Sequence, residues 1–167
     1  MPNADSIRFW KEVAEKYKDF GTVIFELYNE PTSVTPKVWL EGDATYVGHQ
    51  ALYDAVRKDI GATNLVIING LDWGYDLSFV NDHFKVIGDN IIYGAHPYNE
   101  KGSDNHSGPG GSLDNNLKGV LGKYPLIFTE FGVNMSSYFP NGYQEVYQRN
   151  LAYMTEHNIS YTAFAWW

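Results

Sequence analysis

The stretch Thr22-Val-Ile-Phe-Glu-Leu-Tyr-Asn-Glu-Pro31 decides how the rest of the chain is interpreted. It begins as an apolar, β-branched and aromatic run, which predicts a buried strand. It ends in Asn29-Glu30-Pro31, and the strand must break there because proline cannot donate to a strand ladder. In α/β proteins the carboxyl ends of the strands carry the chemistry, so Glu30 is a candidate functional carboxylate.

A second stretch, Pro125-Leu-Ile-Phe-Thr-Glu-Phe-Gly132, repeats this arrangement about 100 residues later. It is also an apolar run that ends in a glutamate, Glu130, and Gly132 supplies the turn. Two carboxylates at the ends of two strands of one domain are a candidate acid/base and nucleophile pair.

Composition limits the partners of the chain. At 167 residues it is long enough for one domain with a genuine core, and we treat residues 1–167 as a single domain. The net charge of −8, without a basic stripe, argues against nucleic acid, and no run predicts a membrane span or a signal peptide. The absence of cysteine excludes disulfides and thiolate metal sites. Aromatic residues reach 16%, which suits a cleft that stacks on sugar rings, although core packing explains any single ring equally well.

Strand and helix patterns alternate along the chain. Near-continuous apolar strands that alternate with helices predict an α/β fold, in which a parallel sheet is covered by helices. The long stretch 99–112 has no apolar period and predicts a functional loop. Residues 79–86 fit one helical turn or two. We expect strands at about 22–28, 64–69, 90–98, 125–130 and 160–167, a helical turn at 36–40, and helices at about 6–18 with Asp5 or Ser6 as N-cap, 44–60 opened by Asp43, 113–122 and 143–157.

A parallel sheet would collect several chemically active side chains at one end. Alternation along strands groups Glu30 with Glu26, and Glu130 with Phe128. Such a set makes a poor core but suits glycoside hydrolysis, which needs an acid, a nucleophile and an aromatic floor. The side chains expected at this end are Glu30, His96, Tyr98, Glu130 and Trp166.

These motifs resemble glycoside hydrolase family 5, the retaining cellulases and related β-glycanases built on a (β/α)8 barrel. The resemblance rests on Phe25-Glu-Leu-Tyr-Asn-Glu-Pro31, His96-Pro-Tyr98 and Ile127-Phe-Thr-Glu-Phe-Gly132, which occur in the family's order. It implies a partial (β/α)8 TIM barrel, a half-barrel of about five parallel strands that correspond to the family's fourth to eighth. It also implies a β-glucan polysaccharide or oligosaccharide as partner, no cofactor, no metal and a secreted protein.

The resemblance also implies catalytic roles. Glu30 matches the acid/base and Glu130 the nucleophile of a retaining double displacement on β-1,4-linked glucan. In that geometry the carboxyl groups lie roughly 5–5.5 Å apart, so that ionising both is unfavourable. Glu30 is therefore expected to hold a proton while Glu130 stays ionised.

Other residues match positions that bind the sugar. By the resemblance Asn29 bonds the 2-hydroxyl, and His96 and Tyr98 form the sixth-strand pair, with the phenol close to the nucleophile. Trp166 matches the tryptophan that floors the subsite of the cleaved sugar, and Phe164 or Trp167 are alternatives for this role. Loop aromatics are further candidates for sugar stacking, with loop packing as the alternative; Trp73 is preferred among Trp39, Trp73, Tyr75, Tyr138 and Phe139.

The chain also departs from the family pattern. The family's first three strands have no counterpart here, so Glu26 is expected to lack the cation that those strands supply. Burial of an unpaired carboxylate costs several kcal/mol. Open sheet edges invite pairing, so we expect a homodimer or association with a complementary barrel fragment.

Two other functions remain open from the sequence. The chain could be a catalytically weak or inactive barrel fragment that binds glucan or merely folds and self-associates. A metal-dependent hydrolase is less favoured, because His49, His83, His106 and His157 lack ligand spacing and fit surface or helix positions. Release of reducing ends from a glucan separates the first alternative from an enzyme, and chelator sensitivity would identify the second.

Overall fold

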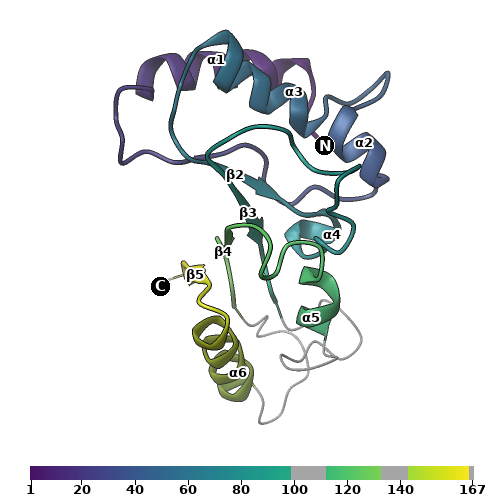
Figure 1. Cartoon of the computed structure of the whole chain (residues 1–167), viewed down its shortest axis with the longest axis vertical. Coiled ribbons are helices and arrows are strands. Elements are labelled where there is room, and N and C mark those ends of the chain that lie inside the picture. The colour runs from purple at the N-terminus through teal and green to yellow at the C-terminus, as the bar shows by residue number, and fades with distance from the viewer. Residues whose placement is uncertain (99–111, 133–142, 166–167) are drawn as a thin grey trace.

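The computed structural model describes residues 1–98, 112–132 and 143–165. Within these residues the sheet has five strands in the order β1-β2-β3-β4-β5, and each neighbouring pair is parallel. This architecture confirms the predicted α/β partial barrel (Figure 1). The strands are β1 (Phe25–Glu26), β2 (Val66–Asn69), β3 (Ile91–Ala95), β4 (Leu126–Phe128) and β5 (Ser160–Tyr161).

The register of the sheet brings the carboxyl ends of its strands to one edge. Glu26 pairs with Ile67, Asn69 with Gly94, and Ala95 with Phe128. Because all strands are parallel and adjacent in chain order, the segments that follow them meet at this edge. The strands are shorter than predicted, since the paired part of the 22–28 run is only Phe25–Glu26.

Helices lie outside the sheet, with α1 (Ala4–Tyr17) and α6 (Tyr143–Glu156) at opposite ends of the molecule (Figure 1). The predicted start of α1 is wrong by a few residues. Asn3 is its N-cap, because the Asn3 side chain accepts hydrogen bonds from the backbone N–H groups of Asp5 and Ser6. The short helix α2 (Pro36–Glu41) falls where the sequence predicted a helical turn, and α5 (Ser112–Leu117) covers only the first part of the helix predicted at 113–122.

The helix predicted at 44–60 begins later than expected. Asp43 accepts hydrogen bonds from the N–H groups of Thr45 and Tyr46, at 2.7 and 2.8 Å, and so stabilises a turn instead of opening a helix. The helix α3 (His49–Asp54) follows, and it continues into one π-helical segment, η1 (Ala55–Asp59). Both elements pack beside α1.

The connection between β2 and β3 breaks the regular alternation of strand and helix. Residues 79–86 form turns and bends without a helix, so neither helical interpretation of this stretch is correct. The connection starts with α4 (Leu71–Gly74), in which Asp72 and Trp73 have left-handed φ values of 53° and 59°. Buried Leu77, Val80 and Val86 cover this part of the sheet from an irregular segment.

The core lies between the sheet and its outer helices. Phe25 and Leu27 are buried, and the indole of Trp10 in α1 donates a 2.7 Å hydrogen bond to the Leu27 carbonyl. Trp39 and Tyr75, which the sequence left as candidates for sugar stacking, are also buried and belong to the core. No helix in the described parts of the chain has the length and apolar character to cross a membrane.

Candidate active site

Glu30 lies four residues beyond the last paired residue of β1, in a strained backbone conformation. Its φ of 49° falls in the left-handed region, which non-glycine residues adopt at a cost of about 1–3 kcal/mol. Such strain is typical of functional sites. The carboxylate is 23% exposed, and its Oε1 lies 3.1 Å from Nδ1 of His96.

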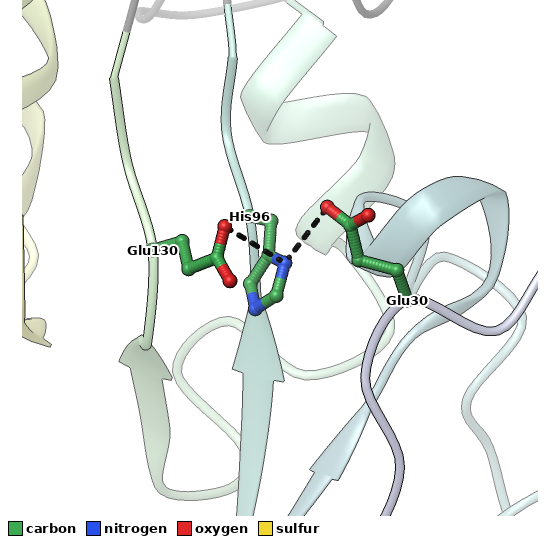
Figure 2. A group of neighbouring side chains, drawn as sticks. All are labelled: Glu30, His96 and Glu130. Atoms are coloured by element: carbon green, nitrogen blue, oxygen red, sulfur yellow. Dashed lines mark hydrogen bonds and ion pairs between the residues drawn. The ribbon is translucent and has the colours of Figure 1, made fainter. Parts of the chain in front are cut away.

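His96 brings the two candidate carboxylates together. It follows β3 directly and is fully buried, while Glu130 follows β4 two residues after its end. Nδ1 of His96 lies 3.8 Å from Oε2 of Glu130, so both carboxylates approach the same ring nitrogen (Figure 2). The ligand atoms of these three residues lie within 4.8 Å of one another. The carboxylates that the sequence placed at separate strand ends therefore open onto one site.

Tyr98 and Gly132 orient the Glu130 carboxylate. The hydroxyl of Tyr98 donates a 2.8 Å hydrogen bond to Oε2 of Glu130. The Tyr98 ring packs so closely over Gly132 that a Cβ there would lie 2.9 Å from a ring carbon. A glycine in the turn after Glu130 therefore lets the phenol reach the carboxylate.

Behind His96, a chain of hydrogen bonds leads to Glu26. The Thr129 hydroxyl donates to Oε1 of Glu26 at 2.7 Å, so its oxygen accepts the hydrogen of His96 Nε2 at 2.9 Å. The amide of Asn69 donates to the same Glu26 oxygen at 2.8 Å. Glu26 is therefore not left unpaired without the cation of the missing strands, because Asn69 of the adjacent strand β2 and Thr129, which follows the more distant β4, donate hydrogen bonds to it.

This hydrogen-bond network shifts the pKa values of Glu26 and His96 in opposite directions. Burial raises the pKa of Glu26, but hydrogen bonds from His96, Thr129 and Asn69 outweigh it, and the net pKa lies below its ordinary value. Burial lowers the pKa of His96, but the carboxylates of Glu26, Glu30 and Glu130 outweigh it, and the net pKa lies above its ordinary value. The imidazole is thus held as a hydrogen-bonded cation in a cage of carboxylates over a wider pH range than a free histidine.

The other predicted site residues differ in their placement. Asn29 is exposed and lines a groove of about 420 Å³ beside Glu26 and Tyr28. Trp73 is 53% exposed, and its backbone N–H donates a 3.2 Å hydrogen bond to the carbonyl of Pro31, the residue after Glu30. The described residues therefore place both beside the acidic turn that ends the first strand.

The aromatic floor predicted after β5 falls largely outside the described residues. Trp166 and its alternative Trp167 both lie there, as do Tyr138, Phe139 and His106. Phe164 is 49% exposed, and its N–H donates to the Phe131 carbonyl at 3.2 Å. Phe164 therefore lies beside the turn that carries Glu130.

Thr129 and Asn69 are site residues that the sequence analysis missed. Each is a polar residue at the carboxyl end of an apolar strand, and that position is the signal that could have identified them. Phe128, which the sequence grouped with Glu130, is fully buried, whereas Glu130 lies two residues beyond the end of β4 and is partly exposed in the site.

His49 lies outside this site; of the surface or helix positions that the sequence offered, it takes a helix position, and it is fully buried. It is the first residue of α3, stacks on Trp39 with ring centroids 4.7 Å apart, and has Nδ1 2.8 Å from the Trp39 carbonyl. Burial lowers its pKa to about 4. His49 is therefore a neutral core residue.

Comparison with known proteins identifies the family. A family model described as cellulase (glycosyl hydrolase family 5) matches residues 3–167. The chain belongs to glycosyl hydrolase family 5. The motifs from which the family was predicted all lie within the matched residues.

Family 5 relatives are considerably longer than this chain. An endoglucanase of Clostridium saccharobutylicum is 28% identical over 158 residues, which are 94% of this chain and 32% of the relative. Endoglucanase Z of Dickeya dadantii is 31% identical over 130 residues, which are 77% and 27% of the two chains. A solved beta-glucanase of Saccharophagus degradans has a TM-score of 0.74 at 24% identity and covers 97% of this chain and 51% of its own. The chain thus spans about a third of these curated relatives, and its fold matches part of the family 5 barrel.

Proposed function

We propose that this domain hydrolyses β-1,4-linked glucan as an endoglucanase, by a retaining double displacement with Glu30 as acid/base and Glu130 as nucleophile. The observation that carries this proposal is the approach of both carboxylates to one imidazole, with the ligand atoms of all three residues within 4.8 Å of one another. Oxygens this close place the two carboxylates on one site, as a retaining mechanism requires, in which the carboxyl groups lie roughly 5–5.5 Å apart. Further support comes from relatives named as endoglucanases and from the beta-glucanase of Saccharophagus degradans, which was solved in complex with cellotetraose.

In the first step Glu130 attacks the anomeric carbon. A bond forms between a carboxylate oxygen and that carbon while the bond from the carbon to the glycosidic oxygen breaks, and Glu30 gives its proton to the departing oxygen. The hydrogen bond from Tyr98 fixes one oxygen of Glu130 and leaves the other for the attack. His96, whose Nε2–H is held by Thr129, presents Nδ1 to Glu30 and keeps a proton close to that carboxylate.

In the second step the glycosyl ester is hydrolysed. Formation of the ester removes the negative charge of Glu130, which makes loss of the Glu30 proton in the first step more favourable. Glu30 then takes a proton from water as the water oxygen attacks the anomeric carbon, and the Glu130 carboxylate departs with its electron pair.

Glucan is held beside these groups by Asn29, which bonds the 2-hydroxyl, and by exposed aromatic rings. Trp73 is assigned to stacking because it is half exposed and its backbone contacts Pro31, next to Glu30. Trp166 is assigned to the floor of the subsite for the cleaved sugar on the ground of the family resemblance. His96 and Tyr98 complete the set of binding residues.

The domain works in this proposal as a homodimer or together with a complementary barrel fragment. The support is physical: β1 and β5 each have one strand neighbour in the described sheet, and open edges favour pairing. Ile24 and Tyr161, next to or on these edge strands, are 44% and 48% exposed. A partner that covers them would remove apolar surface from water at roughly 25 cal/mol per Å².

The experiment is a hydrolysis assay on size-separated fractions of the protein. Reducing ends released from carboxymethylcellulose and lichenan are measured for the wild type, for Glu30→Gln and for Glu130→Gln. Glu12→Gln serves as matched control, because Glu12 is an exposed glutamate of α1 that is not one of the site residues. We expect both site variants to lose activity and the control to retain it. Undiminished hydrolysis by Glu130→Gln would refute the proposal.

A further inference from the structure

Three ligand atoms converge at the candidate active site from three different strand ends. Nδ1 of His96 lies 3.1 Å from Oε1 of Glu30 and 3.8 Å from Oε2 of Glu130, and the three residues each offer a ligand atom within 4.8 Å of the others. We propose that these three residues bind a divalent transition-metal ion of the Zn²⁺ type, which blocks the site and does not serve as a cofactor. The binding stands on the geometry alone, whereas its inhibitory effect rests on the proposed glucan hydrolysis.

The distances between the ligand atoms suit a small tetrahedral ion. Bonds of 2.0–2.2 Å to nitrogen and oxygen place neighbouring ligands of a tetrahedral Zn²⁺ about 3.3 Å apart. Nδ1 of His96 lies 3.1 Å from the Glu30 oxygen and 3.8 Å from the Glu130 oxygen, so these distances bracket the required value. Both carboxylate side chains are 23% exposed, so an ion can reach the site from solvent.

The nitrogen and oxygen ligands of this site favour one class of metal ion. One imidazole and two carboxylates suit Zn²⁺, Co²⁺ and Cu²⁺ better than Mg²⁺ or Ca²⁺, which prefer oxygen ligands alone. Two negative carboxylates balance the charge of a divalent ion. Three protein ligands leave a fourth position of the tetrahedron for water.

The surroundings of His96 hold its ring as metal-binding histidines are held. Such a histidine donates its second ring N–H to an acceptor, which fixes the tautomer and orients the ring. Here Nε2–H points to the Thr129 oxygen, and the Thr129 hydroxyl in turn donates to the Glu26 carboxylate. When an ion displaces the proton of Nδ1, the lone pair of this nitrogen faces the carboxylates of Glu30 and Glu130 (Figure 2).

Ion binding at this place competes with the proposed chemistry. An ion bound to Oε1 of Glu30 occupies an oxygen of the proposed acid. An ion bound to Oε2 of Glu130 reduces the negative charge of the proposed nucleophile. Hydrolysis should thus fall as Zn²⁺ is added and recover when a chelator removes the ion.

The test measures binding directly in the chelator-treated chain. ZnCl₂ is titrated by calorimetry and CoCl₂ by visible absorption, since four-coordinate Co²⁺ has intense bands. The variants are His96→Gln, which removes the central ligand, Glu130→Gln, which removes a partly exposed ligand, and Thr129→Val, which removes the support of the ring. The control is His83→Gln, because His83 is an exposed histidine away from the strand ends. Circular dichroism checks that each variant is folded.

We expect one ion per chain and tetrahedral Co²⁺ bands. His96→Gln and Glu130→Gln should weaken binding at least tenfold, Thr129→Val should weaken it about tenfold to a hundredfold, and His83→Gln should leave it unchanged. If His96→Gln does not fold, Glu130→Gln decides alone. Equal affinity of wild type and Glu130→Gln, or no binding at millimolar ion, overturns the site. Binding without any glucan hydrolysis supports the site and refutes the proposed function, and hydrolysis without binding does the reverse.

Discussion

The hydroxyl of Tyr98 donates a 2.8 Å hydrogen bond to Oε2 of Glu130, the proposed nucleophile. A hydrogen bond to a charged group contributes roughly 1.5–3 kcal/mol. Tyr98→Phe removes the donor and keeps the ring that packs against Gly132. We therefore expect kcat/KM on lichenan to fall roughly tenfold to a hundredfold, with an unchanged melting temperature. Tyr46→Phe is the matched control, because Tyr46 is an exposed tyrosine in the loop before α3. A Tyr98→Phe enzyme as active as this control would contradict the role of Tyr98 in orienting Glu130.

Glu26 should act on His96 through space and through Thr129. Because Glu26 raises the pKa of His96, Glu26→Gln should lower it. A histidine with a raised pKa in the folded state stabilises the fold below its unfolded pKa, and this contribution is lost as the pH rises through the folded value. The variant should therefore lose stability mainly at pH values between the lowered pKa of Glu26 and the raised pKa of His96. Imidazole shifts measured by NMR in chelator-treated protein report the pKa, and a pKa of His96 equal to that in Glu12→Gln would refute the coupling.

The buried His49 should give the stability of the fold a second dependence on pH, opposite in sign to that of His96. Its pKa is about 4 in the folded chain and 6.5 in a reference peptide, so the unfolded chain binds more protons between these values. Stability should fall as the pH drops from about 6.5 to 4, by up to about 3 kcal/mol from this residue. His49→Gln should flatten the change of denaturation midpoint with pH in that window, and His83→Gln should not. An equally steep profile in His49→Gln would show that His49 is not the buried neutral group.

Gly74 packs against the ring of His96, and Gly61 provides a matched control for a substitution at Gly74. Both have φ near 75°, where alanine costs about 1–2 kcal/mol, but a Cβ at Gly61 meets nothing, whereas one at Gly74 would lie 3.1 Å from the His96 ring. Gly61→Ala should thus show the backbone cost alone, and Gly74→Ala a larger loss of stability together with a shifted His96 resonance. Equal losses in chemical denaturation, with His96 unmoved, would mean that the ring is not packed against Gly74.

The sequence was sufficient to predict the sheet and the meeting of Glu30, His96, Tyr98 and Glu130. The reason is that a parallel sheet gathers its strand ends at one edge, so that each motif could be placed from its own strand. It was not sufficient where a side chain's partner comes from a distant strand. Glu26 looked unpaired because Thr129, its hydrogen-bond donor, is 103 residues away along the chain.

The cluster of Glu30, His96 and Glu130 has no local signature in the sequence for a similar reason. Glu30 and His96 are 66 residues apart and come from different strands, so no local pattern links them. The start of α3 was misjudged because an aspartate before a helical stretch suits an N-cap and a tight turn equally well, and Asp43 forms the turn. These errors concern local choices that only the tertiary contacts decide.

The central claim is that Glu130 forms a covalent bond to the sugar. The most direct test treats each size-separated fraction with an activated 2-deoxy-2-fluoro cellobioside, which slows hydrolysis of the ester, and follows it by intact mass and peptide mapping. We predict one added glycosyl group in an active fraction, located on the peptide that contains Glu130 and absent in Glu130→Gln. Hydrolysis of glucan by a fraction that takes up no label, or a label on another residue, would contradict the account.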